Sequence, residues 1–348
     1  MLSRVLNLKF FFRDPDKKRI SIIIKEMIIY GWIKKELPTD YIRKFLYRKE
    51  IKNYKNYLSL NQFNSIITSK KMVFPEISSI LNNKLSFSYY FSQHNLPIPK
   101  LLGYNLKSFY YFNDTVKVVT NKSDLADYFK NVFKITGEKK LFLKLLNELG
   151  GKGIILLSEE TLEMDLALHA DGLLNNSYIH QKVLEQHADI NKIHSGSINT
   201  IRMDTYIDNK NNVHILSAVM RFGIGKSIVD NISSGGFFIS IDMDSGSLKG
   251  HGVQHITKGL LKITKHPISN VELNGFKIPF FLEACELSKK AATYLPNRIV
   301  GWDIAIGVDG PIIIEGNHNP SLHLSDVAYG GYCSHPLIKE ILKEIKKA

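Results

Sequence analysis

Three side chains that offer oxygen ligands interrupt two apolar runs near the end of this 348-residue sequence: Asp303, Glu315 and Asn317. The runs flank Val308-Asp309-Gly310, and Gly310 supplies the positive φ on which a three-residue hairpin loop ends. The predicted hairpin pairs Gly307 with Pro311, which fixes the register of every residue further along the two strands.

In that register Asp303 lies opposite Glu315, with the two Cβ atoms about 5 Å apart. Two carboxylates at that distance repel each other, and Asn317 adds an amide oxygen on the same face of the strand as Glu315. Carboxylate and amide oxygens are ligands that suit Mg²⁺. The pattern therefore predicts a metal site, and the alternative is a surface hairpin whose acidic side chains face water.

A glycine-rich loop over residues 147–153 separates two strand-like runs, residues 141–146 and 154–157. Such a turn lets backbone N–H groups approach phosphate oxygens closely, and lysines beside it neutralise the phosphate charge. The residues of this predicted phosphate loop and its flanking strand are Lys144, Gly150, Gly151, Lys152 and Gly153. The spacing matches neither a Walker A loop nor the glycine pattern of dinucleotide sites.

Two arginines project from one predicted sheet. On the strand over residues 199–207, Thr200, Arg202 and Asp204 share a face, and Arg221 ends the partner strand. Two guanidinium groups on one sheet favour a polyanion such as a triphosphate or an acyl phosphate. The alternative is that these arginines form surface salt bridges with Asp204 or Asp230.

The charge of the chain is concentrated near its beginning. Residues 1–56 hold 15 Lys and Arg against 6 Asp and Glu, whereas the other 292 residues carry a net charge of only +4. Apolar residues recur there at helical spacing, so we expect a basic helical N-terminal region over residues 1–75. Its role is open between docking to an anionic membrane surface or acidic glycan and a solvated basic face on packed helices.

Composition also sets limits on function. No run approaches the roughly 18 uncharged apolar residues of a membrane span, and we expect no signal peptide. The two cysteines, Cys285 and Cys333, fit a reducing cytosol. Nucleic-acid binding is disfavoured, because the charge lies at one end and no RNA-module motif accompanies it.

Periodicity predicts the remaining elements. Helices are expected over residues 80–95, over 159–174, over 279–295, over 335–348 and from a cap within 121–124. Further strands are expected over residues 110–112, 116–119, 178–183, 213–222 and 237–241.

The order of these parts resembles the ATP-grasp superfamily, and within it the sugar-transfer-associated ATP-grasp group found with polysaccharide biosynthesis. The segments that carry the resemblance are Ser197-Ile-Asn-Thr-Ile-Arg202, Val229-Asp-Asn-Ile-Ser-Ser-Gly-Gly236, Val300-Gly-Trp-Asp-Ile-Ala305 and Ile314-Glu-Gly-Asn317. The resemblance covers about residues 78–340. It implies an α+β fold in which two α+β subdomains clasp ATP: a pre-domain over 76–140, a nucleotide-clasping subdomain over 141–190 and a C-terminal subdomain with the metal site over 191–348.

The resemblance also implies roles for individual residues. Lys84 and Lys144 would contact the nucleotide, the loop from Gly150 to Gly153 would close over the phosphates, and Gln181 and Val183 would meet the adenine edge. Gln181 stands where an acidic residue is common, so the ribose contact is open among Glu185, His187 and Asp189. Arg202 and Arg221 would hold phosphate oxygens during catalysis, and Asp303, Glu315 and Asn317 would bind Mg²⁺.

The implied activity is an ATP- and Mg²⁺-dependent carboxylate–amine ligase that acts through an acyl phosphate, joining an amino acid or amine to a uronic acid carboxylate in polysaccharide biosynthesis. The alternatives are a phosphotransferase acting on a sugar hydroxyl and a non-catalytic nucleotide-binding adaptor. The expected location is cytoplasmic, with peripheral contact at the inner face of the membrane. Glycosyltransferases are the expected protein partners.

Overall fold

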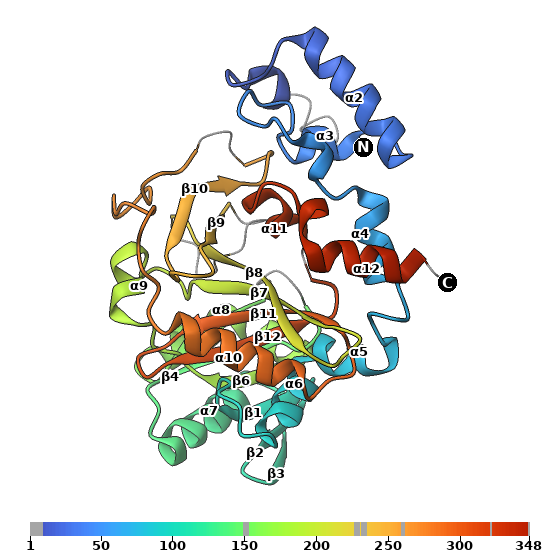
Figure 1. The fold of residues 1–348 in the computed structure, drawn as a ribbon. Helices are drawn as coiled ribbons and strands as arrows, with labels where there is room; N and C mark the ends of the chain where they lie inside the picture. Colours follow the sequence, from blue (N-terminus) through green and yellow to red (C-terminus); the bar gives the residue numbers. More distant parts are fainter. Residues whose placement is uncertain are drawn as a thin grey trace. The chain divides into compact units, whose positions relative to one another are not determined.

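The computed structural model describes residues 10–148, 153–225, 230, 235–258, 262–320 and 322–346. The chain forms two compact units, coloured along the sequence in Figure 1. Unit 1 comprises Met1–Glu76, Gln186–Pro311 and Asn317–Ala348, and unit 2 comprises Ile77–Glu185 and Ile312–Gly316. The four-part division expected from the sequence stays a prediction.

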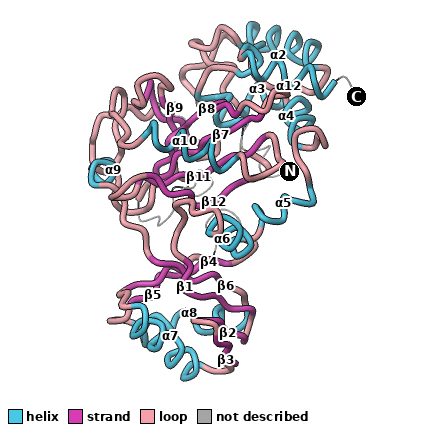
Figure 2. Tube along the Cα trace, turned by 60° about the horizontal axis from the view of Figure 1, so that its bottom comes forward, coloured by secondary structure: helices cyan, strands magenta, loops and turns pink. Residues whose placement is uncertain are grey.

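Unit 2 is built on a sheet with the strand order β3-β2-β1-β6-β4-β5, whose described pairings are all antiparallel. Its strands are β1 (Leu101–Leu106), β2 (Phe109–Phe112), β3 (Thr115–Val118), β4 (Lys140–Leu145), β5 (Ile155–Ser158) and β6 (Tyr178–Lys182). Helices α7 (Lys122–Thr136) and α8 (Leu162–Asn175) contact each other and pack their apolar side chains into one core with these strands (Figure 2). The two strands expected on either side of the glycine-rich loop are confirmed by β4 and β5.

One helix expected over residues 80–95 is two helices, α5 (Pro75–Asn82) and α6 (Lys84–Ser92). The break falls at Asn83, which has extended backbone angles of φ −109° and ψ 118°. Its side-chain oxygen accepts hydrogen bonds from the N–H groups of Leu85 and Ser86, so Asn83 caps the second helix. The capping places Lys84 at the first position of α6.

A buried histidine lies at the centre of the unit 2 core. The Nε2 atom of His180 is 3.2 Å from the side-chain oxygen of Asn105, which already accepts a hydrogen bond from the Tyr178 N–H. Burial lowers the pKa of His180 to about 3, because the charged form would lose its hydration inside the core. The ring is therefore neutral at physiological pH.

The low pKa of His180 predicts that the free energy of unfolding depends on pH. The unfolded chain binds the His180 proton near pH 6.5, so stability is fully present above that pH and is lost as pH falls toward the folded pKa. We expect a slope of up to about 1.4 kcal/mol per pH unit in that window from this residue. Urea unfolding of the wild type and of His180→Gln at several pH values measures it. An equal slope in both proteins would contradict the prediction.

The second sheet has the strand order β10-β9-β8-β7-β11-β12. Its strands are β7 (Thr200–Ile207), β8 (Val213–Phe222), β9 (Phe237–Ile241), β10 (Leu248–Gln254), β11 (Ile299–Ile306) and β12 (Pro311–Asn317). Helix α10 (Phe281–Ala292) packs on β7, β8 and β11 (Figure 1). The expected strands over residues 199–207, 213–222 and 237–241 are confirmed, and with the first sheet they establish the α+β class.

The other helices of unit 1 come from both ends of the chain. They are α2 (Ile20–Lys34), α3 (Thr39–Arg43), α4 (Leu60–Ile67), α9 (Ala188–Ile193), α11 (Leu322–Ala328) and α12 (Pro336–Lys346), with short 3₁₀ turns at Tyr54–Asn56 and Tyr332–Ser334. The elements that were not expected from the sequence include helices α9 and α11 and strand β10. The two helices are only one or two turns long, too short for a helical period to be recognised. Among the described residues, no helix has the length and hydropathy needed to cross a bilayer.

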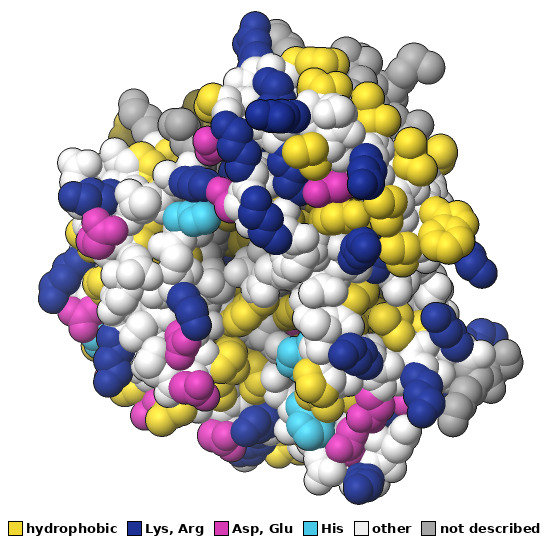
Figure 3. Space-filling model, turned by 45° about the horizontal axis from the view of Figure 1, so that its top comes forward, with side chains coloured by type: hydrophobic (Ala, Val, Ile, Leu, Met, Phe, Trp, Pro, Cys, Tyr) yellow, Lys and Arg dark blue, Asp and Glu magenta, His cyan; other side chains and the backbone are white. Residues whose placement is uncertain are grey.

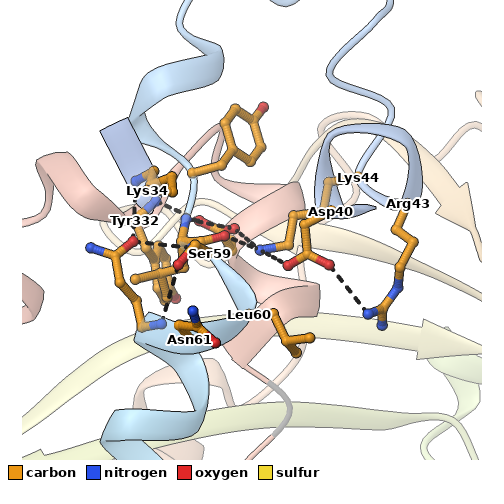
Figure 4. Close-up of polar contacts among 12 residues, drawn as sticks. Lys34, Asp40, Arg43, Lys44, Ser59, Leu60, Asn61 and Tyr332 are labelled. Atoms are coloured by element: carbon orange, nitrogen blue, oxygen red, sulfur yellow. Dashed lines mark hydrogen bonds and ion pairs between the residues drawn. The ribbon is translucent and has the colours of Figure 1, made fainter. Parts of the chain in front are cut away.

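A buried ion pair fastens the N-terminal helices to the C-terminal part of unit 1. The Lys44 ammonium lies 2.7 Å from a carboxylate oxygen of Asp326 and 3.6 Å from Asp40, and all three side chains are almost wholly buried. Asp326 also accepts hydrogen bonds from the N–H groups of Leu58 and Tyr332. Figure 4 shows Lys44 and Asp40 side by side within these contacts. The N-terminal region therefore packs against the rest of its unit, which agrees with the expectation of packed helices.

Candidate functional site

Two arginines converge on one buried aspartate in unit 1. Arg202 on β7 lies directly opposite Asp303 on β11 in the strand register, and its Nε donates to Asp303 Oδ1 at 2.5 Å. Arg221, at the end of β8 on the other side of β7, donates from Nη2 to Asp303 Oδ2 at 2.8 Å. The three residues are 5%, 8% and 3% exposed, respectively. The carboxylate is thus bridged by two guanidinium groups inside the sheet.

Thr200 and Asp230 extend this cluster. The Thr200 hydroxyl donates to Asp230 Oδ2 at 2.5 Å and accepts a hydrogen bond from Arg221 Nη2. Asp230 lies 3.4 Å from Arg221 Nε and also accepts from the Thr200 N–H. Burial raises the pKa of Asp230, while the Arg221 charge acts in the opposite direction. We call Thr200, Arg202, Arg221, Asp230 and Asp303 the arginine–aspartate cluster.

The cluster bears on two expectations from the sequence, the counter-charge of Asp303 and the ion pairs of the two arginines. The charge that compensates Asp303 in this structure is a pair of guanidinium groups, which sequence spacing did not reveal. The alternative expected for the arginines was a surface salt bridge with Asp204 or Asp230. Arg221 does pair with Asp230, but both side chains are buried, so the pair is not a surface salt bridge.

Asp204 has different neighbours although it shares the strand with Arg202. Its Oδ2 accepts hydrogen bonds from the hydroxyls of Ser217 and Ser325 at 3.1 and 3.0 Å. None of the described residues forms a hydrogen bond with its Oδ1, and a Cβ on Gly301 would lie 3.1 Å from that atom. Burial raises the pKa of this carboxyl group, so its protonated form is favoured relative to an exposed aspartate.

Strands β11 and β12 are neighbours in the sheet, as the predicted hairpin requires, but the turn does not show the predicted pairing of Gly307 with Pro311. The Gly307 N–H donates to the carbonyl of Gly310 at 2.9 Å, one residue before the expected partner Pro311, and Gly310 has the expected positive φ, +141°. In unit 1, Asn317 Nδ2 lies 3.5 Å from the carbonyl of Gly301. Glu315, within the Ile312–Gly316 segment of unit 2, is half-buried.

The predicted Mg²⁺ site is judged by the kinds of side chain that could hold the ion. Among the described residues, no three His, Cys, Asp or Glu side chains cluster closely enough to hold a metal ion. The predicted set of Asp303, Glu315 and Asn317 contains two carboxylates and one amide, so it falls outside that pattern. Oxygen donors of these types fit Mg²⁺, and this set remains the candidate.

The predicted nucleotide lysines lie in unit 2. Lys84 donates from Nζ to the carbonyl of Glu148 at 2.5 Å, and its backbone N–H donates to Leu146. Burial lowers the pKa of Lys84, and the charges of Glu315 and Glu148 counteract part of that shift. Lys144, on β4, lies 5.2 Å from the ring centroid of Phe142.

The glycine loop over residues 147–153 is described at both ends, up to residue 148 and from residue 153. Gly153 has a φ of +66°, the left-handed conformation expected of a loop glycine. A Cβ at this position would lie 2.2 Å from a methyl carbon of Leu145, so the turn also needs glycine for space. The predicted positions Gly150, Gly151 and Lys152 lie outside the described residues.

The predicted adenine and ribose positions follow β6. Gln181 is buried within that strand, and Val183 is half-buried just beyond it. Glu185 is exposed. His187 caps the short helix α9 by accepting from the Asp189 N–H, and Asp189 pairs with Lys192 at 2.6 Å, which lowers the Asp189 pKa. Asp189 is therefore paired with Lys192, and the ribose contact stays a prediction among Glu185, His187 and Asp189.

A pocket of about 80 Å³ lies beside the arginine–aspartate cluster within unit 1. Phe238 lines it, and this residue is the direct strand partner of Arg221. Its polar lining includes Arg43, His255 and His323. Burial, helped by the positive charges of Lys44 and Arg43, lowers the pKa of His323 to about 3. No sequence pattern pointed to this pocket, because its lining comes from segments far apart in the chain.

Comparison with known proteins identifies the family. The family described as sugar-transfer associated ATP-grasp matches residues 39–343, so the chain belongs to it. The match begins well before residue 78, the limit expected from the sequence. A comparison with curated proteins found no match.

Solved structures with a similar fold have low sequence identity to this chain. A D-alanyl-alanine synthetase A from Vibrio cholerae is 10% identical with a TM-score of 0.43, covering 79% of this chain and 67% of that one. A biotin carboxylase from Campylobacter jejuni is 12% identical with a TM-score of 0.46, covering 78% and 47%. An N5-carboxyaminoimidazole synthase from Aspergillus clavatus, in complex with ADP, is 11% identical with a TM-score of 0.42, covering 71% and 47%. This chain thus spans about half the length of the last two.

Proposed function

We propose that this protein is an ATP- and Mg²⁺-dependent carboxylate–amine ligase. The observation that carries the proposal is the arginine–aspartate cluster, in a chain of the sugar-transfer-associated ATP-grasp family. In such a cluster the guanidinium groups can bind phosphate oxygens, and the carboxylate can bind a cation. The ligase class is further supported by the solved synthetases with a similar fold.

In the proposed reaction an oxygen of the acceptor carboxylate attacks the γ-phosphorus of ATP. The bond from that phosphorus to the bridging oxygen breaks, ADP leaves, and an acyl phosphate forms. The amine then attacks the carbonyl carbon, phosphate departs with the bonding electron pair, and the nitrogen loses a proton. The chain needs no covalent nucleophile, because positioning and charge neutralisation account for catalysis of this kind.

The residues of the cluster have defined parts in this proposal. Arg202 and Arg221 would donate hydrogen bonds to phosphate oxygens, for which their planar guanidinium groups are suited. Asp230, through Thr200, would keep Arg221 oriented. Asp303, Glu315 and Asn317 would hold Mg²⁺, which when bound supplies charge neutralisation at the phosphates.

The pocket next to the cluster is the proposed acceptor site. Its charged lining contains Arg43, whose side chain is 42% exposed and pairs with Asp40 of the same lining at 3.2 Å, together with Lys44, and its histidines are His255 and His323. Three phenylalanines, Phe45, Phe63 and Phe238, form part of its apolar wall. A carboxylate next to a ring with an apolar face fits such a lining. We propose a uronic acid of a surface polysaccharide as the acceptor and an amino acid as the amine.

The first test is a melting scan with ATP, with and without Mg²⁺. A ligand at about 100 times its Kd that binds only the folded state stabilises it by about 2.7 kcal/mol, which moves the midpoint by several degrees. We expect a shift with ATP that grows with Mg²⁺ and is absent with an uncharged nucleoside. No shift with any nucleotide would overturn the proposal.

Product analysis then separates ligation from phosphotransfer. Uronic acids and amino acids are supplied together, and ADP, phosphate and the amide are measured. Release of ADP and phosphate that depends on both substrates, with an amide as product, supports the ligase. A phosphorylated sugar in place of the amide would show that the protein is a phosphotransferase.

A further inference from the structure

Helix α2 carries a stripe of large apolar side chains that face solvent. Ile20, Ile24, Ile28 and Trp32 follow one another at intervals of four residues, which places them on one face of the helix. Their exposed fractions are 48%, 54%, 66% and 82%. Trp32, the largest, is also the most exposed of the four.

The opposite side of α2 is already packed. Ile23 and Tyr30 are 2% and 0% exposed and belong to an aromatic core with Tyr41, Tyr47 and Tyr54. The helix is therefore apolar on both sides, although only one side has a partner among the described residues. A helix that is apolar all round is normally buried on every side. This one needs a second apolar environment, and its 15 residues are too few to cross a bilayer.

Positive charges lie around the stripe. Arg13, Arg19, Lys25 and Lys35 are exposed, and none of them is in an ion pair within the described part of the chain. The nearby acidic groups are engaged elsewhere: Glu26 pairs with Lys18 at 2.6 Å, and Glu36 accepts hydrogen bonds from the first N–H groups of α4. Figure 3 shows dark blue Lys and Arg side chains and yellow hydrophobic ones gathered together at the top of the molecule, over the N-terminal helices.

We infer that the exposed face of α2 docks on an anionic lipid bilayer surface. The apolar stripe enters the boundary between headgroups and acyl chains, where the rings of tryptophan are favoured. The exposed arginines and lysines at its sides meet the phosphate groups of anionic lipids. An acidic glycan would satisfy the cations but would leave the four apolar side chains in water. The inference is independent of the proposed ligase activity.

The test is flotation of the full-length protein with vesicles. Vesicles of phosphatidylcholine alone are compared with vesicles that also contain phosphatidylglycerol. We expect the protein to float with the anionic vesicles and to be released by high salt, since part of the attraction is electrostatic. Binding to neither kind of vesicle would overturn the inference.

The two tryptophans give a second measurement. Trp302 is fully buried, whereas Trp32 is exposed, so a change in emission on adding vesicles reports on Trp32. We expect a shift of the emission to shorter wavelength with anionic vesicles. The Trp32→Phe variant should still float but should lose this shift. A shift that persists in that variant would contradict the assignment to α2.

Matched variants locate the surface. The double change Ile24→Gln and Ile28→Gln should lower vesicle binding at least about tenfold, because it removes two apolar anchors. Leu168→Gln on α8 replaces a leucine that is 79% exposed, more than either isoleucine, and should bind as the wild type does. Equal melting midpoints exclude a folding defect. If the double variant binds normally, or if the stripe instead mediates a dimer or a complex with another protein without lipid binding, the inference is wrong.

Discussion

Replacing Asp303 by asparagine is expected to lower the free energy of unfolding of unit 1 by about 3–5 kcal/mol, because removal of one partner of a buried ion pair leaves uncompensated charge. Arg202 and Arg221 both donate to this carboxylate, and all three side chains are at least nine-tenths buried. Arg221 keeps Asp230, whereas Arg202 has no other ion pair among the described contacts. Urea unfolding followed by tryptophan emission measures the effect, since Trp32 and Trp302 both lie in unit 1.

Asp309→Asn is the matched control, since it makes the same chemical change in the exposed loop of the same hairpin. It should alter stability by less than about 0.5 kcal/mol. The double variant Asp303→Asn with Arg202→Met should recover part of the loss, because the second change removes the guanidinium left without a counter-charge. If Asp303→Asn unfolds at the wild-type urea concentration, the cluster does not stabilise the fold.

The elements that carry the cluster could be predicted from sequence, because their signals are local. Strands β7 and β8 are eight and ten residues long, and their predicted limits were within a residue of those observed. Strand β11 is one of the two apolar runs of the predicted hairpin. Local signals of this kind depend on the side-chain period of a strand and on the conformations that glycine and asparagine allow. They placed Arg202, Arg221 and Asp303 on strands.

The pairing of those residues could not be predicted in the same way. Arg202 and Asp303 are 101 positions apart, and they meet because β7 lies between β8 and β11 in the sheet. Strand order is a property of the whole fold, so Asp303 was matched with Glu315, the residue that the predicted local hairpin placed opposite it. The pocket proposed for the acceptor was missed for the same reason, since α3, β9, β10 and α11 each supply a part of its lining.

The basic N-terminal region has one packed face and one exposed face, and the sequence pattern does not separate them. Lys44 is buried against Asp326, which agrees with helices that pack against the rest of the unit. On α2, the face that carries Ile24, Ile28 and Trp32 is apolar and exposed. Helical spacing of isoleucines cannot separate these cases, because packing and membrane contact both require apolar side chains on a helix face.

Changing Glu315 to glutamine is expected to reduce ADP release at least about 100-fold while the protein stays folded, because the proposed Mg²⁺ ligand loses its negative charge. Glu315 is half-buried, and its charge also counteracts the burial that lowers the Lys84 pKa, so the variant should lower that pKa further. Glu286→Gln, an exposed glutamate on α10, is the control and should leave turnover unchanged. Glu315→Asp retains a carboxylate and should recover part of the rate at raised Mg²⁺ concentration. Wild-type turnover by Glu315→Gln with an unaltered Mg²⁺ dependence would remove Glu315 from the metal site, and the arginine–aspartate cluster would then have to bind the nucleotide phosphates without it.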